Sequence, residues 1–241
     1  MSVSGPRKYY PRLRLGSLAP AALLLYLVAA PSAALETIAK QVILMDAETS
    51  TVLFEKDADD TMAPSSMSKL MTVYMVFERL KNGSLTLDDK LPVSKKAWRK
   101  GGSKMYVLVG KSVRVEDLLR GIIVQSGNDA TIVVAEGLAG TEEAFSTEMT
   151  KKGQEIGLEN SVFRNASGWP EEGHYMTARD IAILSKRTID DFPDYYHYYA
   201  ETSFTFSGIR QGNRNPLIYR NMGADGLKTG HTDAAGYGIT T

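Results

Sequence analysis

Apolar and polar positions repeat with two different periods along the chain. Short apolar runs at Lys40–Asp46 and Thr51–Lys56 flank the turn residues 47–50, a pattern that predicts a β-hairpin. Helical periodicity dominates the middle of the chain, where the helix-stop residues Asn82-Gly83, Gly140 and Gly157 separate segments. The predicted helices are Ser66–Lys81, Val115–Val124, Asp129–Leu138, Thr141–Ile156, and Thr177–Ile189 with Thr177 as its N-cap.

Strand patterns return near the C-terminal end, at Phe204–Phe206, Leu227–Thr229 and Tyr237–Thr240. Strands at both ends of a helical middle predict an antiparallel sheet whose halves lie far apart in the sequence and are covered by helices. We therefore expect an α/β (α+β) fold with a helical subdomain.

The N-terminal 34 residues have the organisation of a secretion signal. Four basic residues (Arg7, Lys8, Arg12 and Arg14) precede an apolar run from Leu15 to Ala30, and small residues follow at 31–34. A membrane-spanning helix is the alternative, but the run has 16 residues and contains a proline, whereas a span needs about 20. We expect residues 1–34 to be a cleaved signal peptide, so that 35–241 is an exported domain.

Charge and composition exclude several classes of function. Lys+Arg and Asp+Glu both number 28, and removal of the signal leaves an excess of four acidic residues, so we expect no nucleic-acid partner. The chain has no Cys, and its three His lack the spacing of a zinc site. We therefore expect no disulfide and no metal.

Ser66-Met67-Ser68-Lys69 places a hydroxyl and an amine one turn apart at the predicted start of a helix. A lysine that loses its proton through burial or a neighbouring cation can activate such a serine as a nucleophile. Taken alone, the spacing is more often a helix N-cap followed by a surface lysine.

Two more short motifs carry polar groups. Ser126-Gly127-Asn128 lies between two predicted helices, where it is either a pair of cleft side chains or a helix stop followed by a cap. Lys228-Thr229-Gly230 begins a predicted strand, so Lys228 and Gly230 share one face and Thr229 takes the other. A glycine there allows a peptide backbone to approach closely, although an ordinary bulge is the simpler interpretation.

The three motifs together, in this order, are the set found in penicillin-binding proteins and class A β-lactamases. The chain resembles the low-molecular-weight penicillin-binding proteins, which are serine-type D-alanyl-D-alanine carboxypeptidases. The resemblance covers most of 38–241, including the stretches KQVILMDAETSTVLFEKDAD, MAPSSMSKLMT, RGIIVQSGNDA, NASG, TARD, GIRQGNRNPL and DGLKTGHTDAAGYG.

This resemblance implies a serine β-lactamase/transpeptidase-like fold and hydrolysis of the terminal D-Ala-D-Ala bond of peptidoglycan stem peptides, without a cofactor. Ser66 would be the nucleophile, Lys69 its base and Ser126 a proton relay, while Asn128 would orient Lys69 and the substrate amide. The backbone N–H groups of Ser66 and His231 would form the oxyanion hole. The residues implied to bind the substrate are Asn128, Lys228, Thr229, Gly230, His231 and Arg214. The same resemblance implies β-lactam antibiotics as inhibitors and a location in the periplasm or on the outer face of the bacterial inner membrane.

Two alternatives remain at this stage. A β-lactamase would need a second base, and Glu155 in Glu155-Ile-Gly-Leu158-Glu159-Asn160 is a near match to the E-x-x-L-N loop, one residue too long. The second alternative is an inactive, truncated remnant, because members of the family continue beyond Tyr237–Thr240 with a further strand and a helix. We therefore expect a catalytic domain at 35–241 that is incomplete at its C-terminus.

Overall fold

The computed structural model describes residues 1–2, 4–5, 8–9 and 36–241. Residues 1–37 and 38–241 are separate units, and only the second contains the helices and strands described below. Most of the predicted signal peptide lies outside the described residues. Among the described residues, no helix is both long enough and apolar enough to cross a membrane.

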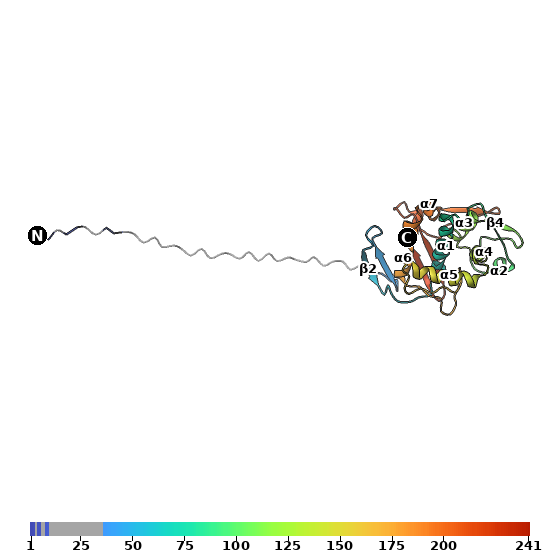
Figure 1. The fold of residues 1–241 in the computed structure, drawn as a ribbon, viewed down its shortest axis with the longest axis horizontal. Helices are drawn as coiled ribbons and strands as arrows, with labels where there is room; N and C mark the ends of the chain where they lie inside the picture. Colours follow the sequence, from blue (N-terminus) through green and yellow to red (C-terminus); the bar gives the residue numbers. More distant parts are fainter. Residues whose placement is uncertain (3, 6–7, 10–35) are drawn as a thin grey trace. The chain divides into compact units, whose positions relative to one another are not determined.

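Five helices of nine or more residues form the body of the second unit (Figure 1). They are α1 (Lys69–Lys81), α3 (Val115–Ile123), α4 (Asn128–Ala139), α5 (Glu142–Glu155) and α6 (Ala178–Asp191). The shorter helices are α2 (Lys95–Arg99) and α7 (Pro193–Tyr196), with 3-10 turns η1 (Ser65–Ser68), η2 (His197–Ala200) and η3 (Leu217–Tyr219).

The core forms around α1, which contacts α3, α4, α5 and α6. Every residue of α1 is buried except Glu78, Arg79 and Lys81 near its C-terminal end. Burial of apolar side chains is the main stabilising contribution, at about 25 cal/mol per Å². The helix therefore presents its N-terminal turn, where the Ser66-x-x-Lys69 motif lies, from a rigid support.

Side-chain caps define the start of three helices. The hydroxyls of Ser94, Thr141 and Thr177 accept hydrogen bonds from the backbone N–H three residues later, at 3.0, 3.0 and 3.1 Å. Such a bond satisfies one of the N–H groups that the first turn leaves free. The predicted N-cap Thr177 is thereby confirmed.

The strands form antiparallel pairs. They are β1 (Val42–Met45) with β2 (Val52–Lys56), β3 (Lys90–Pro92) with β4 (Ser112–Arg114), β5 (Ser203–Phe206) with β6 (Ile209–Gly212), and β7 (Lys228–Thr232) with β8 (Gly236–Thr240). The predicted hairpin is confirmed as β1–β2, and the late strands as β5, β7 and β8.

The single sheet expected from these strands is not continuous in the described residues. The β1–β2 and β7–β8 hairpins both contact α6, but no hydrogen-bonded ladder joins one hairpin to the other. Antiparallel strands covered by helices are thus confirmed, whereas the pairing between the two ends of the chain is absent here.

Candidate active site

Ser66 and Lys69 lie together at the start of α1. Ser66 is in the 3-10 turn η1, Lys69 begins the α-helix, and Lys69 Nζ lies 2.8 Å from Ser66 Oγ. The lysine side chain is completely buried, whereas Ser66 is partly exposed. The geometry brings a potential nucleophile and base into hydrogen-bonding distance, as their spacing predicted.

The pKa of Lys69 lies well below its ordinary value. Burial is the largest cause, and the positive charges of Lys228, Arg214 and Lys100 add to it, while Asp129 opposes the shift. A buried amine that is repelled by neighbouring cations loses its proton more easily. The lowered pKa favours the neutral amine, which is the form that can accept the proton of Ser66.

The Ser167 carbonyl oxygen accepts a hydrogen bond from Lys69 Nζ at 2.6 Å. This contact was not predicted, although Ser167 belongs to the NASG stretch (residues 165–168) that contributes to the family resemblance. A neutral amine has two N–H donors and one lone pair. When one N–H is held by Ser167, the lone pair remains available to Ser66.

Strand β7 passes directly beside the turn that carries Ser66. A Cβ added to Gly230 would lie 2.1 Å from Ser65 Oγ and 3.1 Å from the backbone nitrogen of Ser66. The absence of a Cβ at Gly230 thus lets β7 pack closely against the Ser66 turn, and its predicted part in substrate binding stays a prediction. Lys228 and Gly230 are buried on the same face of β7, and Thr229 is partly buried.

Lys228 and Arg214 form a cationic pair near the buried lysine. The pKa of Lys228 is lowered to about 7, first by burial and then by the charge of Arg214. Arg214 is exposed, and its Nη1 donates to Ser103 Oγ at 2.6 Å. Both residues repel a proton on Lys69, and together they offer positive charge to an anionic group.

Ser126 and Asn128 lie at the junction between α3 and α4. Ser126 Oγ is buried and has no hydrogen-bond partner among the described residues, and its backbone has φ of 60°. Asn128 begins α4, and its Nδ2 donates to the Gly101 carbonyl at 2.9 Å. The structure therefore places Asn128 against Gly101, and it is Ser167 that holds Lys69.

His231 has an exposed ring that lies 4.1 Å from that of Tyr237 across the β7–β8 hairpin. Because its side chain points away from the buried face of β7, only its backbone can face the Ser66 turn. This placement is compatible with the expectation that the backbone N–H of His231 forms part of the oxyanion hole.

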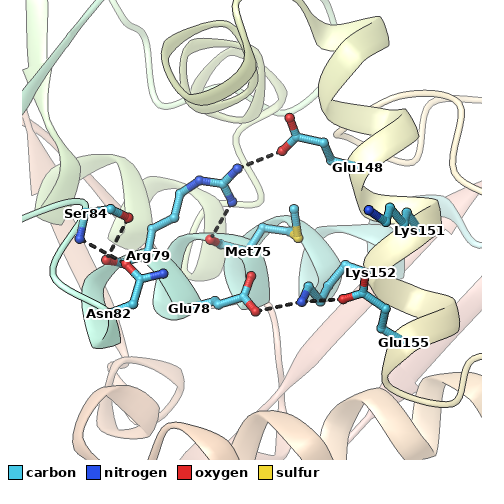
Figure 2. Close-up of a pocket in the computed structure, with 9 residues that line it drawn as sticks. All are labelled: Met75, Glu78, Arg79, Asn82, Ser84, Glu148, Lys151, Lys152 and Glu155. Atoms are coloured by element: carbon cyan, nitrogen blue, oxygen red, sulfur yellow. Dashed lines mark hydrogen bonds and ion pairs between the residues drawn. The ribbon is translucent and has the colours of Figure 1, made fainter.

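Glu155 is far from this cluster. It lies on α5 and pairs with Lys152 at 2.6 Å, and Lys152 also pairs with Glu78 at 2.8 Å (Figure 2). These residues line a surface hollow of about 380 Å³ at the C-terminal half of α1. Glu78 is nine residues beyond Lys69 on α1, or about 13 Å at 1.5 Å per residue. The carboxylate that a β-lactamase would need is thus separated from Ser66.

A serine beside a buried lysine of lowered pKa is the arrangement of a serine acyl-transfer site. The family model described as D-alanyl-D-alanine carboxypeptidase, the S11 peptidase family, matches residues 28–241. The chain belongs to this family.

Individual relatives agree with the assignment. D-alanyl-D-alanine carboxypeptidase DacC of Escherichia coli is 42% identical over 204 residues, which are 82% of this chain and 51% of that relative. The crystal structure of the carboxypeptidase DacD from Francisella tularensis matches with a TM-score of 0.81 at 34% identity, over 84% of this chain and 62% of that one. The ampicillin-bound penicillin-binding protein D2 of Listeria monocytogenes matches with a TM-score of 0.75 at 30% identity, over 84% of this chain and 83% of that one.

These structures confirm the expected transpeptidase-like fold. The chain spans about half the length of the curated relatives it matches.

Proposed function

We propose that residues 35–241 form the catalytic domain of a serine D-alanyl-D-alanine carboxypeptidase that acts on peptidoglycan stem peptides. The observation that carries this proposal is the 2.8 Å contact between Ser66 Oγ and the Nζ of a buried Lys69 whose pKa is lowered. The matches to named carboxypeptidases support the choice of substrate.

In this proposal Ser66 Oγ attacks the carbonyl carbon between the two terminal D-alanines, and its proton passes to Lys69 Nζ. The backbone N–H groups of Ser66 and His231 stabilise the oxyanion. One such donor is typically worth about 10²–10³ in rate. The proton on Lys69 then passes through Ser126 Oγ to the leaving D-alanine nitrogen. Water hydrolyses the ester on Ser66, which releases the shortened stem peptide as a carboxylic acid and returns a proton to Ser66 Oγ.

The positive groups of the site select the substrate. Lys228, Thr229 and Arg214 bind its terminal carboxylate, and the Asn128 side chain receives the substrate amide. A β-lactam has a carboxylate and a reactive amide in a similar relation and acylates Ser66 in the same way. Ampicillin bound to the Listeria relative supports this part of the proposal.

The N-terminal segment indicates where the protein acts. Its basic residues, apolar run and small residues support export of 35–241 across the inner membrane, followed by action in the periplasm or on the outer face of that membrane. The named relatives are bacterial.

Intact-protein mass spectrometry after incubation with benzylpenicillin tests the proposal, with Ser66→Ala as the matched variant. We expect one penicilloyl adduct on the parent chain, none on the variant, and release of D-alanine from a pentapeptide. A folded parent chain without an adduct would favour the inactive-remnant alternative. An adduct that forms and disappears within seconds would favour a β-lactamase.

A further inference from the structure

The segment that carries the Ser167 carbonyl has no regular secondary structure. Residues 163–171 belong to the loop that is closed by the isolated bridge of Val162 with Tyr175. No helix or strand ladder holds the backbone in place, yet the carbonyl of Ser167 lies 2.6 Å from Lys69 Nζ. Some other group must hold this turn.

A buried carboxamide makes most of the hydrogen bonds that hold it, and Glu142 Oε1 adds one by accepting from the N–H of Ala166 at 3.2 Å. Asn165 Oδ1 accepts from the backbone N–H groups of Ser167, Gly168 and Trp169, at 3.2, 2.9 and 3.0 Å, and from Ser167 Oγ at 3.1 Å. Its Nδ2 donates to the Trp169 carbonyl and to Glu171 Oε2, both at 2.9 Å. Asn165 is 5% exposed, so these bonds are shielded from water.

The arrangement of these bonds determines where the carbonyl points. When successive N–H groups converge on one acceptor, the carbonyls of the same peptides point away from it. The carbonyl of Ser167 is directed to Lys69, and that of Ala166 accepts from Thr72 Oγ1 at 2.7 Å, one turn further along α1. The turn is thus attached to α1 at two successive carbonyls.

We propose that Asn165 is a positioning residue for Lys69, acting through the Ser167 carbonyl to set the direction of the amine lone pair toward Ser66. The inference rests on the proposed function, because the lone pair matters only if Lys69 is the base. Without this turn, Nζ would rotate freely about its last bond and water would reach it. Asn165 itself touches neither the substrate nor Ser66.

The test compares two substitutions. Asn165→Leu keeps the approximate size of the side chain and removes every hydrogen bond. The double exchange of Asn165→Asp with Glu171→Gln restores the acceptor oxygen and keeps the net charge. The new amide at position 171 can donate to the new carboxylate at position 165, so that of the six bonds only the one to the Trp169 carbonyl is lost. Asn82→Leu is the matched control, because Asn82 Oδ1 accepts one N–H, from Ser84, at the other end of α1.

For Asn165→Leu we expect the acylation rate constant with benzylpenicillin to fall at least 30-fold, while the dissociation constant of the initial complex changes less than threefold. The exchange variant should recover to within about fivefold of the parent, and Asn82→Leu should match the parent. Equal losses in the exchange variant and in Asn165→Leu would overturn the proposal, as would an unchanged rate in folded Asn165→Leu.

A second readout does not depend on turnover. NMR titration of ¹³Cε-labelled lysine, with Lys69→Arg to assign the signal, follows Lys69 directly. In Asn165→Leu the pKa of Lys69 should rise toward its ordinary value, because the opened turn admits water. If the parent fails to acylate, the proposed function fails, and an unchanged Lys69 titration in the variant would separately overturn the positioning role. If Asn165→Leu does not fold, Asn165→Ala takes its place, because it also removes the acceptor oxygen: an unchanged acylation rate and an unchanged Lys69 titration in folded Asn165→Ala overturn the proposal.

Discussion

Gly168 lies directly against the carbonyl oxygen of Ser65, the residue before the nucleophile. A Cβ added at Gly168 would lie 1.6 Å from that oxygen, and the φ of Gly168 is +77°. Ser65 itself has a φ of +47°, a conformation that non-glycine residues seldom adopt. Backbone strain of this kind persists only where the surrounding contacts enforce it. The turn of Gly168 is therefore part of what holds the Ser66 turn in its reactive geometry.

We expect Gly168→Ala to reduce acylation of Ser66 by benzylpenicillin at least 100-fold and to lower the free energy of unfolding by about 2–4 kcal/mol. The new methyl group cannot be accommodated unless the 65–66 backbone moves. Rates from intact mass spectrometry and urea denaturation provide the two measurements.

Gly83→Ala is the matched control for Gly168→Ala. Its φ is +78°, but nothing lies within 4 Å of the added Cβ. Gly83→Ala should therefore lower the free energy of unfolding by about 1 kcal/mol, the backbone cost of alanine at this φ. Its Ser66 should be acylated at the rate of the parent. Equal acylation rates in Gly168→Ala and Gly83→Ala would contradict the close contact with Ser65.

Asp129 holds the loop that borders the site on its helical side. Its Oδ1 accepts from the N–H of Met105 at 2.9 Å, and its Oδ2 accepts from those of Tyr106 and Val107 at 2.9 and 3.1 Å. The side chain is fully buried. In Asp129→Asn one oxygen becomes an NH₂ group that faces N–H donors, and buried donors without a partner cost about 1–3 kcal/mol each.

We expect Asp129→Asn to lower the free energy of unfolding by about 3 kcal/mol, measured by urea denaturation at pH 7. The exposed Asp89 accepts a single N–H, from Thr86, at 2.7 Å, so Asp89→Asn is the control and should cost less than about 1 kcal/mol. Similar losses for the two variants would show that the buried network contributes little.

The sequence pattern predicts the elements of this fold better than it predicts the contacts between them. The hairpin β1–β2, the long helices and the proximity of Ser66 to Lys69 follow from local spacing, which depends on residues within one turn or one ladder. The placement of Ser167 against Lys69 joins residues 98 positions apart. No local pattern encodes that distance.

The roles of individual polar side chains are the feature of the candidate site that is hardest to predict from the sequence. The family resemblance implies that Asn128 orients Lys69, yet its amide donates to Gly101. Asn165 and Asp129 lie inside stretches that support the family resemblance. The side chain of each accepts hydrogen bonds from several backbone N–H groups of an irregular loop. Loops of this kind have no periodicity from which such contacts can be inferred.

Glu155 provides a test against the β-lactamase alternative. It is paired with Lys152 on α5, at the hollow in Figure 2, and is separated from Ser66 by much of α1. We expect Glu155→Gln to leave the lifetime of the penicilloyl-enzyme within twofold of the parent, measured by the decay of the adduct in intact mass spectra. Glu148→Gln, at the same hollow, is the control and should behave alike. A lifetime at least tenfold longer in Glu155→Gln alone would assign it a part in deacylation.

Lys228 makes the stability of the protein depend on pH in a defined direction. Its pKa is about 7 in the folded protein, because of burial and of Arg214, against an ordinary value of 10.5. Between these two values the unfolded chain binds a proton that the folded protein does not, so the free energy of unfolding rises with pH. One such group contributes up to ~1.4 kcal/mol per pH unit in this window, and nothing further above it.

We expect Lys228→Met to remove this contribution, so that urea denaturation at pH 7, 8.5 and 10 gives a flatter profile than that of the parent. Lys69, whose pKa is also lowered, contributes to the slope that remains. Lys90→Met, at an exposed position on β3, removes the same charge and should run parallel to the parent. If the Lys228→Met profile is also parallel to that of the parent, folding does not lower the pKa of Lys228. Lys228 is then charged in the folded protein and repels a proton on Lys69 more strongly than a neutral amine would.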